Sequence, residues 1–239
     1  IAAINWQFFT ELPTPPGLEG GGVANAIIGT VLMTALATVL GVPAGLLAGV
    51  YLAEFGKHSR LGAWVRFTVN MLMGIPSIII GLFVYSALVF PFGHFSGFAG
   101  GVSLAILMFP VVARTTEDML SMVPNALREA ALSIGNPRWM ATLSIIFRAA
   151  KSGLITGVLL SVARVSGETA PLLFTALNSP YMMKSFNEPI ANLTVTIYQY
   201  AMSPYDDWNQ VAWGASLVIM MTVLLLNLLA RFIVRGRKV

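Results

Sequence analysis

Long runs of apolar residues without a charge alternate along the chain with shorter charged segments. Lys, Arg, Asp and Glu are absent from 20–53, 67–93, 95–113 and 208–230. A fifth run, 152–183, contains only two charged residues. A helix that crosses a hydrocarbon core about 30 Å thick needs roughly 20 apolar residues. We therefore predict five membrane spans, near 24–51, 68–90, 96–113, 153–177 and 209–230.

This pattern predicts an all-α membrane protein, a polytopic helical bundle that forms one transmembrane domain over 1–239. The runs are too long and too uniformly apolar for the strands of a β-barrel, and helices satisfy their own backbone groups in lipid. Of the 239 residues, 56% are apolar or aromatic and 10% are charged. Soluble domains carry about 25% charged residues, so a water-soluble enzyme is excluded.

The basic residues show which connections face the cytoplasm. Twelve of the 14 Lys and Arg residues lie in 54–66, in 114–151 or after residue 230. The connections 1–23 and 178–209 carry acidic residues and a single lysine. Since basic connections stay on the cytoplasmic side, we expect the C-terminus there and the first segment outside. The pI of about 9.6 then reflects topology, and no nucleic-acid partner is expected.

The first segment is expected outside the membrane, yet it has neither the basic flank nor the apolar stretch of a signal peptide that would direct its export. The sequence starts with Ile1 rather than Met. A segment of this kind reaches the outside only if something upstream carries it there. We therefore expect at least one further span to precede Ile1, which gives six spans in all.

The cytoplasmic connection 114–151 is long and patterned. Proline and glycine positions predict two short helices, 126–134 and 137–149, separated by a left-handed stop at Gly135. Two helices that meet at such a corner form a rigid knob. Three of its charged side chains are expected to face the cytoplasm, namely Arg128, Glu129 and Arg138. An amphipathic hairpin lying on the lipid surface is the alternative.

Small residues and prolines mark the spans themselves. Small residues recur every four positions in the first span, at Ala37, Gly41, Gly45 and Gly49. They predict close packing against another helix, with a backbone-lined pathway as the alternative. Prolines are expected to kink the spans at Pro43, Pro76, Pro110 and Pro171. In the external connection, the aromatic-rich segment 189–202 predicts a helix lying in the membrane interface.

The residues of the cytoplasmic knob resemble a known signature. The letters EAA at 129–131, followed by Gly135 and Ile145, are similar to the EAA motif of ABC-importer permeases. At 147–148 the chain has Phe-Arg where that motif usually has Leu-Pro. The resemblance implies a coupling helix that sits in a cleft of a cytoplasmic ATPase. The residues assigned to this role are Arg128, Glu129, Ala130, Ala131 and Gly135.

Four further stretches restrict the resemblance to one group of these permeases. They are 74–78, 110–117, 163–175 and 189–193. Residues 163–175 read ARVSGETAPLLFT and resemble the PstA-type permease subunits of phosphate-specific ABC importers. The similarity runs over nearly the whole chain. It implies the MetI-like transmembrane-domain fold of type I ABC importers, with five spans visible of an expected six.

Two charges interrupt the fourth predicted span. Arg164 lies 13 residues beyond Lys151, roughly 20 Å along a helix, and Glu168 follows one helical turn later on the same face. A charge at the membrane centre costs about 2.5–3.5 kcal/mol, so both should face protein or a water-filled path. A guanidinium matches two phosphate oxygens at once, and Glu168 would keep Arg164 oriented when no anion is bound. A buried structural ion pair is the alternative.

The predicted substrate path consists of Arg164, Glu168, Thr169 and Arg114. Thr169 belongs to the motif that resembles phosphate permeases. Arg114 lies at the inner end of its span. It is either a second contact for the anion or an ordinary cytoplasmic anchor.

The resemblance implies the permease subunit of a phosphate importer in a bacterial inner membrane. It also implies a homologous second permease (PstC-like), two copies of an ATPase (PstB-like) and an external phosphate-binding protein (PstS-like). Three alternatives remain. They are an ABC permease for another oxyanion or an amino acid, a secondary transporter driven by an ion gradient, and a phosphate-sensing scaffold that does not transport.

The sequence gives no sign of catalytic chemistry. It has no cysteine and two distant histidines, so no metal site or thiol nucleophile is expected. It also lacks a G-x-x-x-x-G-K-[ST] loop, which excludes a P-loop nucleotide site. We therefore expect no cofactor and no catalytic residue, with ATP hydrolysis left to the partner ATPase.

Overall fold

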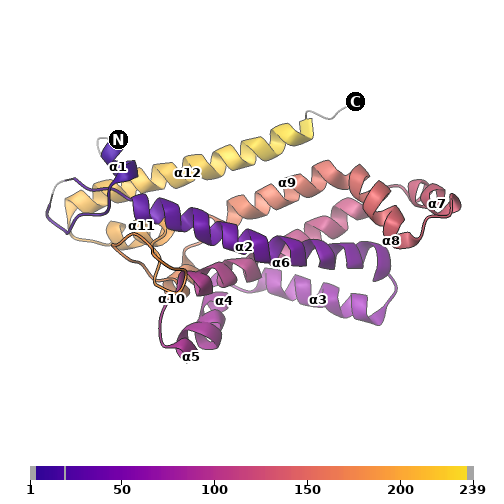
Figure 1. Ribbon diagram of the computed structural model, residues 1–239, viewed down its shortest axis with the longest axis horizontal. Helices are drawn as coiled ribbons and strands as arrows, with labels where there is room; N and C mark the ends of the chain where they lie inside the picture. The colour runs from indigo at the N-terminus through magenta and orange to yellow at the C-terminus, as the bar shows by residue number, and fades with distance from the viewer. Residues whose placement is uncertain (1–3, 19, 236–239) are drawn as a thin grey trace.

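The computed structural model describes residues 4–18 and 20–235, and all regular structure within them is helical (Figure 1). The α-helices are α1 (Trp6–Thr10), α2 (Ala24–Val50), α3 (Arg60–Gly74), α4 (Ser77–Val84), α5 (Phe90–Phe92), α6 (Gly97–Ser121), α7 (Asn125–Ser133), α8 (Arg138–Ala141), α9 (Phe147–Val165), α10 (Ala170–Thr175), α11 (Leu193–Ala201) and α12 (Asp206–Arg235). Three π-helical turns continue or join them, at Tyr51–Phe55, Tyr85–Val89 and Thr142–Ile146. The predicted helical membrane bundle is confirmed.

Four of the described helical segments are long and apolar enough to cross a membrane. They are Ala24–Phe55, Gly97–Ser121, Arg138–Val165 and Asp206–Phe232. The predicted spans 24–51, 96–113 and 209–230 match three of these segments to within one residue at the start and are confirmed. The other two predicted spans, 68–90 and 153–177, need correction.

The predicted span 68–90 is not one straight helix. Two helical segments, Arg60–Gly74 and Ser77–Phe92, meet at an angle of 104°. Ile75, directly before Pro76, has extended backbone angles (φ −76°, ψ 129°). Proline disfavours the helical conformation in the residue before it and has no N–H to continue the ladder. The proline kink expected here is therefore a sharp break.

The predicted span 153–177 is also divided, and it begins earlier than expected. One continuous helical segment runs from Arg138 to Val165 and includes the π-helical turn and α9. The separate cytoplasmic helix predicted at 137–149 is therefore wrong, because that segment leads directly into the span. After Val165 the helix stops, and α10 follows with Pro171 in its first turn. Pro43 and Pro110, by contrast, lie inside the continuous helices α2 and α6.

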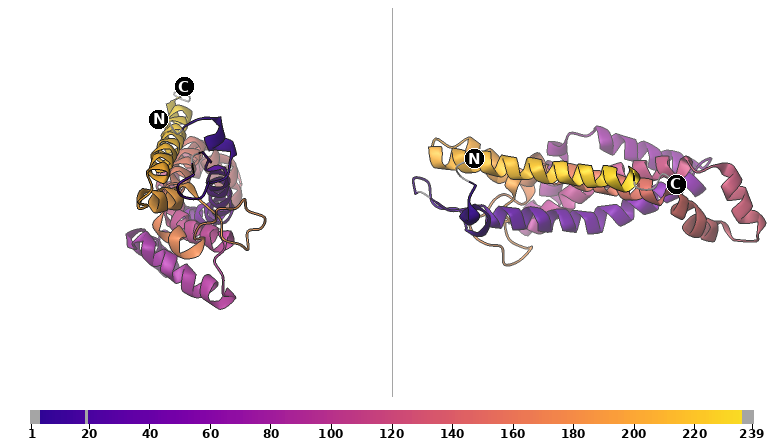
Figure 2. Two further views of the ribbon diagram at one scale, coloured as in Figure 1. Left: turned by 90° about the vertical axis from the view of Figure 1, so that its left-hand side faces the viewer. Right: turned by 90° about the horizontal axis from the view of Figure 1, so that it is seen from above.

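The bundle is elongated, with different structures at its two ends (Figures 1 and 2). The helices α7 and α8 project from one end. At the other end lie α1, α11 and the long irregular segment before α11. The helix α12 runs along the bundle, and its C-terminal end points toward the end that carries α7.

The closest packing in the core joins α2 to α6. The expected stripe of small residues on α2 is buried, at Ala37, Gly41, Gly45 and Gly49. A Cβ atom added at Gly49 would lie 2.4 Å from the Cβ of Thr116 and 2.5 Å from the carbonyl oxygen of Ala113. Backbone therefore meets side chain directly along this contact. The small residues serve helix packing, as predicted, and the backbone-lined pathway is wrong.

The segment 189–202, predicted to lie in the membrane interface, contains α11. Most side chains of α11 are buried, including Leu193, Val195 and Tyr200. Two hydrogen bonds fix its start, because Asn192 caps it and the Leu193 N–H donates to the Thr30 hydroxyl of α2 (2.9 Å). The helix is therefore packed against the end of the bundle, and its position in the membrane interface stays a prediction.

The α2–α6 contact generates a stability prediction. We expect Gly49→Ala to lower the free energy of unfolding by about 1–3 kcal/mol, because the added methyl group overpacks the contact. Thermal unfolding of the purified protein in detergent measures the effect. The matched control is Gly74→Ala, where a Cβ meets nothing within 4 Å. An equal melting temperature for the two variants would contradict the close α2–α6 packing.

Candidate functional site

A backbone break at 166–169 separates α9 from α10. Two tight turns close the end of α9, in which the N–H groups of Gly167 and Glu168 donate to the carbonyls of Arg164 (3.2 Å) and Val165 (3.1 Å). Pro171 then starts α10, where its missing N–H leaves no helical hydrogen bond unmade. Three of the predicted path residues, Arg164, Glu168 and Thr169, thus lie at one interruption of a membrane helix.

The side chain of Arg164 lies on the surface of the chain, in the last turn of α9. A helix C-terminus carries partial negative charge and favours a cation at this position. Glu168 is half-buried beyond the end of the helix. The prediction that both residues lie on one helical face, one turn apart, is wrong because α9 ends between them. Among the ion pairs of the described residues, none includes Arg164 or Glu168.

The break is held in place by α11. The Thr194 hydroxyl donates to the carbonyl of Glu168 (2.8 Å), and the Thr194 side chain is itself buried. On the other side of the break, the carbonyl of Thr169 accepts hydrogen bonds from the N–H groups of Leu172 and Leu173 (3.1 and 3.2 Å). The position of the break relative to the end of the bundle that carries α11 is therefore fixed by polar contacts.

Arg114 belongs to a group of charges at the inner end of α6. Its Nε lies 3.2 Å from Asp118 Oδ2, and its Nη1 lies 3.7 Å from Glu117 Oε2. Glu117 is nearly buried, and its Oε1 accepts from Arg66 Nε of α3 (2.8 Å). The group combines two cations with two anions, so Arg114 is already balanced by carboxylates. An anion that binds Arg114 must compete with Asp118.

The cytoplasmic knob has the predicted helix and glycine stop. The helix α7 is followed by Gly135 at φ +86°, a conformation that favours glycine. Glu129 and Ala130 are exposed at the end of the bundle, while Ala131 is buried against it. The motif residues thus divide between an outward face and an inward face of α7.

Arg128 does not face the cytoplasm, which corrects the prediction. Its guanidinium turns toward the bundle, where its Nη2 lies 2.9 Å from Glu54 Oε1. It also donates to the carbonyls of Leu120, in the last turn of α6, and of Val123, just after that helix. The ion pair with Glu54, together with these carbonyls at a helix end, outweighs the exposure that the sequence pattern suggested.

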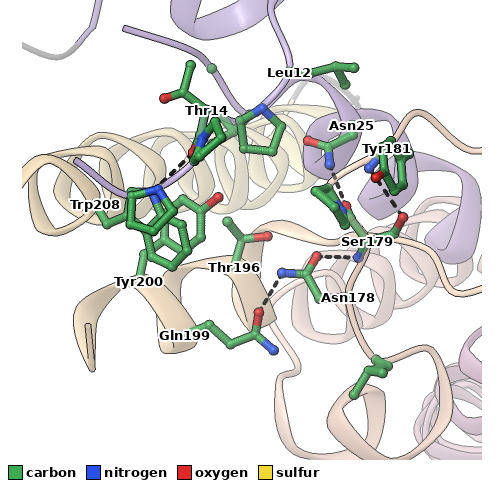
Figure 3. Close-up of a pocket in the computed structure, with 17 residues that line it drawn as sticks. Leu12, Thr14, Asn25, Asn178, Ser179, Tyr181, Thr196, Gln199, Tyr200 and Trp208 are labelled. Carbon is green, nitrogen blue, oxygen red and sulfur yellow. Dashed lines mark hydrogen bonds between the residues drawn. The ribbon is translucent and has the colours of Figure 1, made fainter. Parts of the chain in front are cut away.

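The opposite end of the bundle contains a pocket of about 680 Å³ (Figure 3). Asn25 Nδ2 donates to the carbonyl of Ser179 (2.7 Å), and Asn178 Nδ2 donates to Gln199 Oε1 (2.6 Å), so the lining loop is tied to α2 and α11. Among the residues that the structure describes, none that lines this pocket is charged. Its hydrogen-bonding groups are amides, hydroxyls and backbone, which gives no electrostatic preference for a free anion.

Aromatic side chains close one side of this pocket. Tyr200 stacks on Trp208 with 4.3 Å between ring centroids. Burial raises the pKa of the Tyr200 hydroxyl above its usual value of 10.0, so this group stays neutral. Trp208 Nε1 donates to the carbonyl of Thr14 (3.3 Å), which links α12 to the first loop. The pocket is therefore walled by the first loop, α2, the loop before α11, α11 and α12.

Comparison with known proteins identifies the family. Residues 41–237 match the family model described as "binding-protein-dependent transport system inner membrane component". The whole chain is 51% identical to the phosphate transport system permease protein PstA of Haemophilus influenzae and covers 84% of that protein. It is 49% identical to PstA of Yersinia pestis and covers 81% of it. The chain belongs to the PstA family of transport permeases.

Solved structures support the fold of this PstA-family permease. A chain of the MetNI methionine ABC transporter in an inward-facing conformation superposes with a TM-score of 0.70 at 22% identity, over 90% of this chain and 94% of the other. A chain of an amino acid ABC transporter gives a TM-score of 0.62 at 20% identity, over 87% and 92%. The predicted type I importer fold is confirmed.

Sequence reasoning missed two ion pairs of this PstA-family chain, Arg66–Glu117 and Arg128–Glu54. Each joins an arginine to a carboxylate more than fifty positions away. The sequence feature that could have predicted these ion pairs is the position of each acid, because Glu54 and Glu117 each lie near the end of a long apolar segment. Such an acid rarely lies there without a cationic partner.

The charge group around Glu117 generates a second prediction. We expect Glu117→Gln to lower the free energy of unfolding by about 1–3 kcal/mol, because it removes a charge-assisted hydrogen bond from Arg66 at a nearly buried carboxylate. Asp118→Asn is the matched control. Asp118 and Arg114 are both exposed by 40% or more, and exposed ion pairs contribute about 0–1 kcal/mol. Thermal unfolding of both variants checks this, and equal melting temperatures would refute the distinction.

Proposed function

We propose that this PstA-family chain is the permease subunit of an ATP-driven phosphate importer and that Arg164 lies on the path of the ion. In this proposal the chain forms half of the path, and a homologous permease forms the other half. The observation that carries it is a guanidinium exposed at a break in a membrane helix. The similarity to phosphate permeases over the whole chain indicates that the transported ion is phosphate.

The physical argument starts from the charge of Arg164. An arginine near the middle of a membrane is stable only against protein or water, because lipid does not solvate it. In the isolated chain its side chain is exposed, so another subunit or a water-filled passage must cover this surface. A guanidinium there lowers the barrier for an anion and remains charged at every physiological pH.

Glu168 and Thr169 would moderate this contact. Both are half-buried at the same break, and Glu168 supplies a carboxylate that competes with phosphate for Arg164. Competition of this kind prevents binding that is too tight for release. Arg114, held by Asp118 at the inner end of α6, would offer a second transient contact. The selectivity for phosphate would then lie largely in an external binding protein.

The energy would come from a partner ATPase that docks on the knob. Glu129 and Ala130 are exposed on α7, which projects from one end of the bundle (Figure 1). The end of α12 points the same way, which supports a cytoplasmic C-terminus in a bacterial plasma membrane. Closure of two ATPase subunits would pull α7 inward and rock the spans between outward-open and inward-open states.

The path role of Arg164 is tested by substitution. We expect Arg164→Gln to slow ATP-driven phosphate uptake by about 10- to 100-fold, because a charge-assisted hydrogen bond contributes roughly 1.5–3 kcal/mol. The measurement is uptake of labelled phosphate into proteoliposomes that contain the complete importer. Arg231→Gln, at an exposed arginine near the end of α12, should transport at the normal rate. Normal uptake by Arg164→Gln in an assembled complex would remove Arg164 from the path.

The docking role of α7 is tested at its exposed acid. We expect Glu129→Lys to abolish phosphate uptake while the permease itself melts at the same temperature, because the side chain is exposed and the change lies on the outward face. Co-purification of the ATPase and its hydrolysis rate report on docking. Unchanged uptake with this charge reversal would show that the ATPase does not engage this face.

A further inference from the structure

The inward face of α7 carries one strong polar contact with the rest of the bundle. Arg128 meets Glu54 with its Nε at 3.2 and 3.3 Å from the two carboxylate oxygens and its Nη2 at 2.9 Å from Oε1. This is the two-pronged geometry in which a guanidinium binds a carboxylate most strongly. The side chains are 15% and 10% exposed, so water weakens the pair little.

The same arginine also joins a third segment. Its Nη atoms donate to the carbonyls of Leu120, in the last turn of α6, and of Val123, two residues after that helix ends. Glu54 lies in the π-helical turn Tyr51–Phe55 that ends the α2 segment. One side chain on α7 is therefore bonded to the inner ends of both α2 and α6. These two helices form the most closely packed pair in the bundle.

The helix is interrupted on both sides of α7, so neither connection continues α7 into a neighbouring helix. Residues 122–124 precede it and 134–137 follow it, and Gly135 there has a left-handed backbone. A cavity of about 200 Å³ also lies beside the ion pair, between α7, α8 and the π-helical turn. Two further cations, Lys57 and Arg138, line this cavity, and Glu54 is the one carboxylate in the described part of its lining. Without the ion pair, α7 could tilt into this space.

We propose that the Arg128–Glu54 ion pair is the link that transmits movement of α7 to α2 and α6. The two residues are positioning residues. They do not touch phosphate or nucleotide, and they act by making α7 move as one body with the membrane helices. This inference rests on the proposed function, since it assumes that an ATPase moves α7. It adds which side chains carry that movement into the membrane.

The test measures the ratio of phosphate transported to ATP hydrolysed. The complete importer is reconstituted in proteoliposomes with external binding protein, and both rates are read from the same vesicles. Glu54→Gln removes the charge while it keeps the size of the side chain and leaves Arg128 bonded to the α6 carbonyls. We expect the ratio to fall by about tenfold, within the range of allosteric coupling free energies. Arg128→Gln should do the same.

The matched control is Arg148→Gln, at an exposed arginine on the same end of the bundle that forms none of the ion pairs seen in the described chain. It should keep the normal ratio. If the unmodified importer itself shows no ATP-driven phosphate uptake, the proposed function fails. If it transports phosphate and Glu54→Gln keeps the normal ratio, the ion-pair link fails instead.

A covalent replacement separates transmission from folding. The chain contains no cysteine, so Glu54→Cys with Arg128→Cys introduces the only pair, provided the other subunits are cysteine-free. We expect the double variant to be uncoupled, to recover the ratio when a short bifunctional thiol reagent joins the two positions, and to lose it again on reduction. A double variant that the reagent cannot restore, or one that has lost the ATPase from the purified complex, would overturn the link.

Discussion

A charged side chain inside a membrane must be surrounded by protein or water, and this constraint organises the whole molecule. Most charges lie at the inner ends of the helices, where Arg66, Glu117 and Arg114 balance one another and Arg128 meets Glu54. The exception is Arg164, which stands exposed at the end of α9 within a membrane segment. A chain that keeps such an arginine requires a partner or a water-filled path beside it. In the proposed function, this path is the route of the ion.

Two kinds of contact have different roles in the bundle. Small residues let α2 and α6 approach until backbone meets side chain, which makes this pair a stiff unit along its length. Polar contacts then attach the functional parts to that unit. Thr194 of α11 holds the break between α9 and α10 at one end of the bundle. Arg128 holds α7 at the other end. Movement of the knob can therefore reach the break through the packed helices α2 and α6 as well as along the continuous segment Arg138–Val165.

The sequence predicted the fold class and most spans because a helix in lipid must be long and apolar. The glycine stop at Gly135 was equally readable, since it depends on local backbone preference. Breaks were harder. Composition located Pro76 and Pro171, yet whether a proline kinks a helix, as expected, or ends it depends on tertiary packing, such as that of Gly81 against Pro171. Inward-turned Arg128 was predicted wrongly because its partner, Glu54, is 74 positions away, a distance that helical periodicity does not span.

The most direct test of the account asks whether the surface around Arg164 meets water in the assembled importer. Because the chain has no cysteine, Arg164→Cys and Leu160→Cys introduce single thiols on the exposed side of α9, and Leu225→Cys introduces one on exposed α12. The measurement is labelling by a charged thiol reagent that does not cross lipid. The account predicts that both α9 positions react and that Leu225→Cys does not. An Arg164→Cys thiol that stays as unreactive as Leu225→Cys, with and without ATP, would contradict it.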